Sequence, residues 1–84
     1  MKTKQIFGER LRQLRLEAGL QQKELGEQMG LSNNAIGMME RGNRGTTIEN
    51  VVRLAEFFHV SADYLLGITD DPAWRGGGTG KEDL

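Results

Sequence analysis

The 84-residue sequence contains no cysteine and a single histidine, His59. Disulfides and thiolate zinc sites are therefore excluded, and a chain without cysteine is typical of the reducing cytosol. His59 has no second histidine and no carboxylate cluster at ligand spacing beside it, so neither a metal site nor general-base chemistry can be assembled around it. We expect His59 to end a helix, and we predict no enzymatic activity, no cofactor and no small-molecule ligand.

Long apolar stretches are also absent. No run approaches the roughly 20 apolar residues of a membrane-spanning helix, and the N-terminal segment MKTKQIFGERLRQ lacks the apolar core of a signal peptide. A chain of this length allows one small domain, whose core must use most of the apolar side chains. The sequence therefore predicts a soluble, cytoplasmic protein with no membrane partner.

Neither sign of charge is in clear excess, because 11 basic and 12 acidic side chains give a net charge of −1. Residues 1–69 carry nine basic and eight acidic side chains, and the last fifteen residues carry two and four. Neutralisation of phosphates supplies most of the non-specific affinity of proteins for DNA. A chain with this balance of charge should therefore have only modest non-specific affinity for DNA.

The segment QQKELGEQMGLSNNAIGMMERG, residues 21–42, predicts a pair of short helices joined by a tight turn. Each helix has one narrow apolar edge, with residues three or four apart: Leu25 and Met29, then Ile36 and Met39. Between them, Gly30 can adopt the left-handed conformation that ends a helix, and Ser32 can cap the next one. This arrangement is typical of a helix-turn-helix motif.

The outward side of the second helix carries Asn33, Asn34, Gly37 and Met38, with little charge before its end. Short amide side chains at the start of an exposed helix are suited to contacts with base edges in the major groove. These four residues are therefore our base-contacting candidates. Asn also favours helix starts for its own conformational reasons, so that simpler explanation of Asn33 and Asn34 remains open.

Four segments of the chain together resemble one known family: FGERLRQLR, GLQQKELGEQMGLS, the ERG of residues 40–42, and IENVVRLAEFFHVSADYLLG. From about Phe7 to Leu66 the chain is similar to the Cro/CI-type, or XRE-family, helix-turn-helix domain of phage and bacterial repressors. The resemblance implies an all-α, five-helix, lambda-repressor-like domain. It also implies binding to double-stranded DNA as a symmetric dimer, with the third helix in the major groove.

The resemblance also implies roles for individual residues. Arg15 and Glu40 match a structural ion pair that sets the angle of the recognition helix, although they could be independent surface charges. Five residues match or adjoin positions that contact phosphates: Gln22, Lys23, Asn43, Arg44 and Thr46. Gln22 and Arg44 could equally be solvated, and Met38 could contact a partner protein. Gly26 stands where the family has Ala, and Gln21 where it has a capping Ser or Thr, so we expect close helix packing and a weaker cap.

The remaining helices follow from apolar spacing and caps. Residues 4–18 should form the first helix, with an inward stripe of Phe7, Leu11, Leu14 and Ala18. Thr47 should cap a helix over residues 48–58, with an inward stripe of Ile48, Val51, Ala55 and Phe58, flanked by Leu54. Ser61 should cap a short last helix, with Leu65 and Leu66 inward and Gly67 at its end.

The end of the predicted domain, residues 4–68, is more apolar than an exposed surface requires. Phe57, Tyr64 and Ile68 are our candidates for a dimer interface, the alternative being scattered surface apolarity. From residue 69 the composition changes to TDDPAWRGGGTGKEDL, for which we predict a flexible tail. Trp74 in this tail could fold back onto the domain or await a partner, and the chain could be complete or part of a longer regulator.

The apolar spacing and caps predict the helices, and the resemblance to the Cro/CI-type family implies a sequence-specific DNA-binding transcriptional regulator. We expect it to be a repressor that binds a near-palindromic operator as a homodimer. A protein of a different class also fits the pattern, namely a protein-interaction module such as the antitoxin subunit of a pair.

Overall fold

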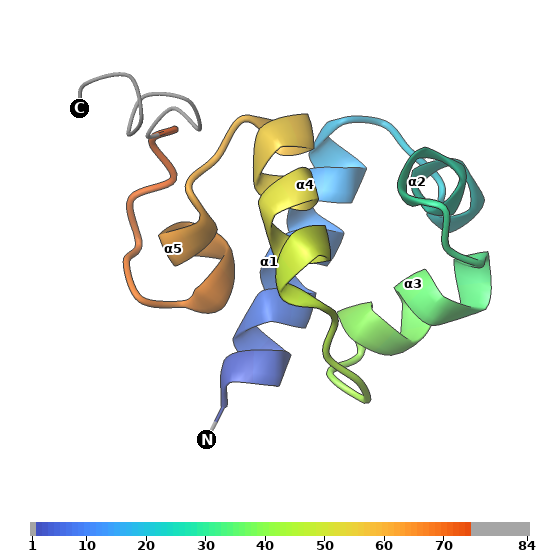
Figure 1. Ribbon diagram of the computed structural model, residues 1–84, viewed down its shortest axis with the longest axis horizontal. Coiled ribbons are helices and arrows are strands. Elements are labelled where there is room, and N and C mark those ends of the chain that lie inside the picture. Colours follow the sequence, from blue (N-terminus) through green and yellow to red (C-terminus); the bar gives the residue numbers. More distant parts are fainter. Residues whose placement is uncertain (1, 75–84) are drawn as a thin grey trace.

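The computed structural model describes residues 2–74 of the chain. Within this range there is no strand, and the helices are α1 (Thr3–Glu17), α2 (Gln22–Met29), α3 (Asn33–Glu40), α4 (Ile48–Phe58) and α5 (Ala62–Leu66). The helix α1 lies in the middle of the molecule, with α2 and α3 on one side and α5 on the other (Figure 1). The prediction of an all-α domain with five helices is confirmed.

Every helix contributes side chains to one hydrophobic core. The buried members are Phe7, Leu11, Leu25, Met29, Ile36, Met39, Leu54, Ala55, Val60 and Leu65. The inward edges predicted for α2 and α3 are therefore confirmed. Their packing places α2 against α3, and α3 against α1, so that the helix-turn-helix is attached to the rest of the domain through its inner faces.

Three helices begin with the hydroxyl caps that the sequence predicts. The side-chain oxygens of Ser32, Thr47 and Ser61 accept hydrogen bonds from the N–H groups of Ala35 (3.0 Å), Asn50 (3.1 Å) and Tyr64 (3.0 Å). Each bond satisfies an amide that has no partner inside its own helix. The starts of α3, α4 and α5 are therefore fixed by local sequence.

Left-handed residues end three of the helices. Gly30 closes α2 with a φ of 71°, and Gly67 closes α5 with a φ of 83°. His59 closes α4 with a φ of 58°, a left-handed conformation that is uncommon for residues other than glycine. The expectation that His59 is a helix-terminus residue is confirmed.

The predicted inward stripe of α1 is correct at Phe7 and Leu11 and wrong at Ala18. The helix ends at Glu17, so that Ala18 is its C-cap and is exposed. One turn after Leu11, the buried position on α1 is instead occupied by Arg15. A charged residue therefore lies on the inner face of this helix, where the apolar pattern alone placed only hydrophobic residues.

The predicted stripe of α4 is wrong at Ile48, which is 81% exposed. The buried arc of this helix is centred on Leu54 and Ala55, with Val51 and Phe58 packed partly against the core. Ile48 is the first residue of the helix and lies one turn before the first packed residue, Val51. Leu54, which we expected to flank the stripe, is at its centre and is fully buried.

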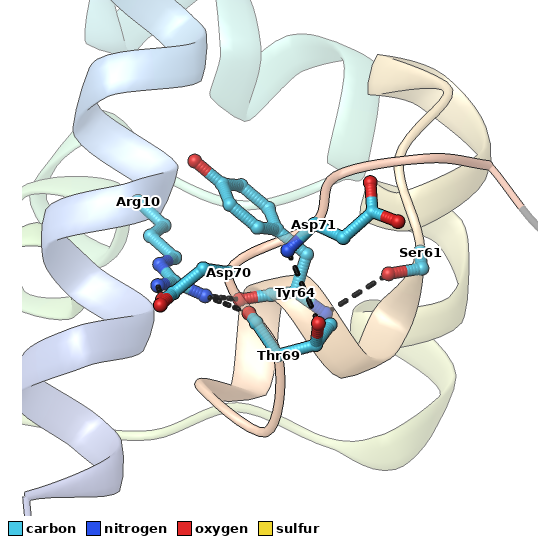
Figure 2. Close-up of polar contacts among 6 residues, drawn as sticks. All are labelled: Arg10, Ser61, Tyr64, Thr69, Asp70 and Asp71. Carbon is cyan, nitrogen blue, oxygen red and sulfur yellow. Dashed lines mark hydrogen bonds and ion pairs between the residues drawn. The ribbon is translucent and has the colours of Figure 1, made fainter.

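Residues 69–74 turn back onto the domain. The guanidinium of Arg10 on α1 donates to the carbonyl oxygens of Tyr64 and Thr69 and to the carboxylate of Asp70, as Figure 2 shows. Its distance to the Thr69 oxygen is 2.7 Å, and it also lies 4.2 Å from the centre of the Tyr64 ring. Arg10 thereby joins α1 to the segment that follows α5.

The last described residue, Trp74, is also held in place. The N–H of Ser61 donates to the carbonyl oxygen of Pro72 at 3.2 Å, and the Trp74 ring stacks on the His59 ring at a centroid distance of 5.0 Å. Trp74 is half-buried and packs against the core. Residues 69–74 of the predicted tail make these contacts, and residues 75–84 lie outside the described range.

Candidate nucleic-acid interface

The turn between α2 and α3 brings the two helices unusually close together at Gly26. A Cβ atom on this residue would collide with the carbonyl oxygen of Leu31 in the turn. The sequence indicated a packing role for Gly26, and the structure shows that even alanine does not fit without a backbone shift. The start of α2 has a capping box, in which the Glu24 carboxylate accepts from the Gln21 N–H at 2.7 Å.

A buried ion pair connects α1 to the end of α3. The Arg15 Nε and Nη2 atoms lie 2.6 Å and 3.0 Å from the two carboxylate oxygens of Glu40, and Arg15 Nη1 donates to the carbonyl oxygen of Leu20 at 2.8 Å. The two side chains are only 9% and 2% exposed. Hydrogen bonding to Glu40 raises the pKa of Arg15 above its ordinary value, against the opposing effect of burial. The pairing that the resemblance implied is thus present in this structure.

Gln22 connects α2 to the same carboxylate, that of Glu40. Its Nε2 atom donates to Glu40 Oε1 at 3.1 Å. Three helices therefore meet at Glu40, which accepts hydrogen bonds from Arg15 and Gln22 at once. We expected the Gln22 side chain to contact a phosphate and brace the first base-contacting residue. In the free protein its amide nitrogen is directed to Glu40, and the residue is half-buried.

The four base-contacting candidates on α3 do not share one environment. Asn33 and Asn34 are exposed, and Met38 is half-buried, with its sulfur atom 3.9 Å from the Asn34 amide nitrogen. Gly37 is buried, although the sequence placed it on the outward side with the others. The reason is that the ends of the Gln22 and Arg41 side chains cover it. Arg41 was not among our predicted site residues.

The predicted phosphate-contacting residues lie on α2 and in the loop after α3. Lys23, Asn43 and Arg44 are exposed, whereas Thr46 is half-buried and accepts a hydrogen bond from the Asn50 amide at 3.0 Å. The carbonyl oxygen of Met38 accepts from the Asn43 N–H at 2.9 Å, which fixes the start of this loop against α3. Lys23 therefore lies before α3 in the sequence, and Asn43 and Arg44 lie after it, all three with exposed side chains.

The three dimer candidates also differ in exposure. Phe57 and Ile68 are 43% and 71% exposed, and the Phe57 ring contacts the Phe58 ring edge-on at 5.0 Å. Tyr64 is half-buried beneath the Arg10 guanidinium and packs against the core, so most of its surface is used within the chain. Phe57 and Ile68 keep apolar surface available for a second molecule.

Other kinds of site find little support in residues 2–74. In this range no three side chains of the types His, Cys, Asp and Glu are arranged to hold a metal ion. None of the helices described above has both the length and the apolar character needed to cross a membrane. The polar side chains on and around α3 remain the main candidate for a functional surface.

Comparison with known proteins identifies the family. A family model described as helix-turn-helix matches residues 11–65, which is more than half of the chain. The chain belongs to the helix-turn-helix family. It is 37% identical over 67 residues to the uncharacterized HTH-type transcriptional regulator YobD of Bacillus subtilis, a match that covers 80% of this chain and 60% of that protein. The Cro/CI-type resemblance is thereby confirmed.

Two solved structures of this helix-turn-helix type have the same fold. The structure of the Salmonella phage P22 c2 repressor in complex with a synthetic operator has a TM-score of 0.68 and 38% identity, covering 71% of this chain and 91% of that one. The restriction-modification controller protein C.AhdI from Aeromonas hydrophila has a TM-score of 0.68 and 34% identity, covering 77% and 98%. The expected lambda-repressor-like arrangement of the five helices is confirmed.

The chain spans less than two thirds of the length of some curated relatives in the family, namely 60% of YobD and 29% of the full P22 repressor. The similarity therefore concerns the helix-turn-helix domain of those proteins.

Proposed function

We propose that this protein is a sequence-specific DNA-binding transcriptional regulator, a repressor that binds a near-palindromic operator in double-stranded DNA as a homodimer. The observation that carries the proposal is that α3 has exposed polar side chains at its start and a fixed end. Its first two residues, Asn33 and Asn34, present exposed amides, while its last residue, Glu40, is fixed to α1 by the buried ion pair. A helix held at one end, with free hydrogen-bonding groups at the other, suits insertion into the major groove.

The relatives support the same function. The P22 c2 repressor, whose fold this chain shares at 38% identity, is seen in complex with a synthetic operator. YobD is named as a transcriptional regulator. On this basis we assign base contacts to Asn33, Asn34 and Met38, and Gly37 lies between them beneath the Gln22 and Arg41 side chains. Amides of Asn favour adenine and a Met methyl group favours the thymine methyl, so a half-site containing A·T pairs is expected.

Phosphate contacts are assigned to Lys23, Asn43 and Arg44, which are exposed, and to Thr46 and Gln22, which are half-buried. The net positive charge is small, because residues 1–69 carry only one more basic than acidic side chain. Non-specific affinity should therefore be low. Two half-sites bound by a dimer would compensate, and the exposed apolar side chains of Phe57 and Ile68 supply surface for the pairing.

The proposal is tested by selecting the purified 84-residue protein against a random pool of duplex DNA at moderate salt and sequencing the retained molecules. We expect an inverted repeat whose half-sites are about one helical turn, roughly 34 Å, apart. Circular dichroism on the same sample establishes that the protein is folded. Sedimentation velocity with the selected duplex should give two chains per duplex.

The competing proposal of a protein-interaction module predicts a different outcome. A folded protein that enriches no sequence would overturn our assignment and favour a module such as an antitoxin subunit. An enriched single site without symmetry would keep the DNA-binding function and remove the dimer. Trp74 offers little support for the module, because its ring is stacked on His59 within the chain.

A further inference from the structure

One stripe of α3 is interrupted by a missing side chain. Asn33, Gly37 and Arg41 are four residues apart, so they follow one another along the same side of the helix and its C-cap. Asn33 is exposed, whereas Gly37 is buried. A residue without a side chain on the groove-facing side would normally leave a gap.

Two neighbouring side chains fill this gap. A Cβ atom on Gly37 would lie 3.2 Å from Arg41 Nη1 and 3.3 Å from Gln22 Oε1. The Arg41 guanidinium therefore reaches back by one turn, from the end of α3 toward Asn33. It occupies the place that the side chain of residue 37 takes in an ordinary helix.

The Arg41 guanidinium has no acceptor of its own among residues 2–74. The adjacent carboxylate, Glu40, is directed to the interior and accepts hydrogen bonds from Arg15 and Gln22. Arg41 itself is exposed and makes no ion pair or side-chain hydrogen bond with the described residues. Its five N–H donors are thus available to a ligand.

We propose that Arg41 contacts a base edge, reading a guanine in each half-site across the space left by Gly37. This inference rests on the proposed DNA-binding function and adds a specificity residue to it. A guanidinium fork matches the O6 and N7 acceptors of guanine, and the Arg–guanine pair is the commonest specific contact in the major groove. The Arg41 guanidinium lies beside Gln22 at Gly37, on the side of α3 that carries the base-contacting candidate Asn33, and this shared side favours a base over a phosphate.

Gly37 has a defined part in this arrangement. The two atoms nearest to an added Cβ are the ends of flexible side chains, not backbone, so Gly37→Ala should fold normally. The methyl group would nevertheless compete with the Arg41 guanidinium for the same space. Gly37→Ala is therefore a second, independent way to displace the guanidinium while leaving its charge in the protein.

The experiment repeats the duplex selection with the wild type, Arg41→Ala, Arg41→Lys and Gly37→Ala. Arg12→Ala is the matched control, because it removes one exposed positive charge from α1. The wild-type motif should contain one G·C pair per half-site. Arg41→Ala and Arg41→Lys should each lose about 5- to 150-fold in discrimination at that pair, since lysine lacks the fork. Gly37→Ala should relax the same pair, and Arg12→Ala should keep the wild-type motif.

Three results would overturn the inference. If Arg41→Ala weakens all sequences equally while Arg41→Lys binds as the wild type does, Arg41 contacts a phosphate. If both variants keep the complete wild-type motif and affinity, Arg41 contacts no DNA, and the proposed function stands without it. If the folded wild type enriches no motif, the proposed function and this inference fail together.

Discussion

Breaking the buried pair between Arg15 and Glu40 from one side should destabilise the whole domain. Arg15→Met removes the guanidinium and leaves the Glu40 carboxylate, which is 2% exposed, with Gln22 as its one side-chain donor among the described residues. An uncompensated buried charge of this kind costs about 3–5 kcal/mol. A chain of 84 residues has a total stability of roughly 4–12 kcal/mol at about 0.05–0.15 kcal/mol per residue.

Removing both partners should cost much less. In Arg15→Met/Glu40→Leu, no charge remains buried, and apolar side chains of similar size fill the space between α1 and α3. We expect a free energy of unfolding within about 1 kcal/mol of the wild type, because buried ion pairs are often replaceable by packed hydrophobic residues. The double variant should nevertheless bind the operator more weakly than the wild type does, because the ion pair no longer fixes the end of α3 to α1.

The assay is urea unfolding of the wild type, both single variants and the double variant, followed by circular dichroism. The coupling energy from this cycle should be about 3 kcal/mol or more. The pH of the measurement is not critical for Arg15. Its pKa is raised in the folded state, so its contribution is fully present below the unfolded-state pKa and is lost only as the pH rises through the folded-state value.

A coupling energy below about 1 kcal/mol, the value for exposed pairs, would refute this reasoning. It would mean that water reaches the pair and that α3 is positioned by apolar packing alone. The chain offers an internal control in the ion pair between Arg10 and Asp70, whose carboxylate is fully exposed. Asp70→Asn should leave the urea midpoint close to that of the wild type.

Four further predictions concern the surface and the turn. Asn34→Ala should weaken operator binding by about 1–3 kcal/mol in a titration by fluorescence anisotropy without changing the melting temperature. Arg44→Ala should weaken all duplexes alike and reduce the slope of log K against log salt by about 1; an unchanged slope would remove Arg44 from the phosphate contacts. Gly26→Ala should lower the free energy of unfolding by about 1–3 kcal/mol in urea, because its methyl group meets the Leu31 carbonyl. Ile68→Asp should shift sedimentation toward the monomer with an unchanged helical spectrum, and a persistent dimer would place the interface elsewhere.

The parts of the fold that local chemistry decides could be predicted from the sequence. Hydroxyl caps, left-handed glycines and apolar residues three or four apart act within one or two helical turns. For this reason Ser32, Thr47 and Ser61 were recognised as helix starts, and the bounds of α4 agree with the prediction. Ile48 shows the limit of such patterns. Its spacing matches the inward stripe of α4, but periodicity does not show whether other helices pack against the first turn.

The contacts of residues 69–74 depend on partners distant in sequence. Asp70, Asp71 and Pro72 have the composition of a loop, and nothing near them in the chain indicates a docking site. The partners are Arg10, sixty residues earlier, and Ser61. Trp74 was the one residue of this segment that indicated such contacts, because a large aromatic side chain in a polar segment often packs against an apolar surface.

The environment of Gly37 depends on Glu40 and could not be derived from α3 alone. Because Arg15 holds the carboxylate of Glu40 from the interior, and Gln22 crosses from α2 to the same group, Arg41 has no ion-pair partner among residues 2–74. Its guanidinium then lies over the one position of the stripe that has no side chain. The ion pair, Gly37 and Arg41 thus form one surface only because α1, α2 and α3 pack together.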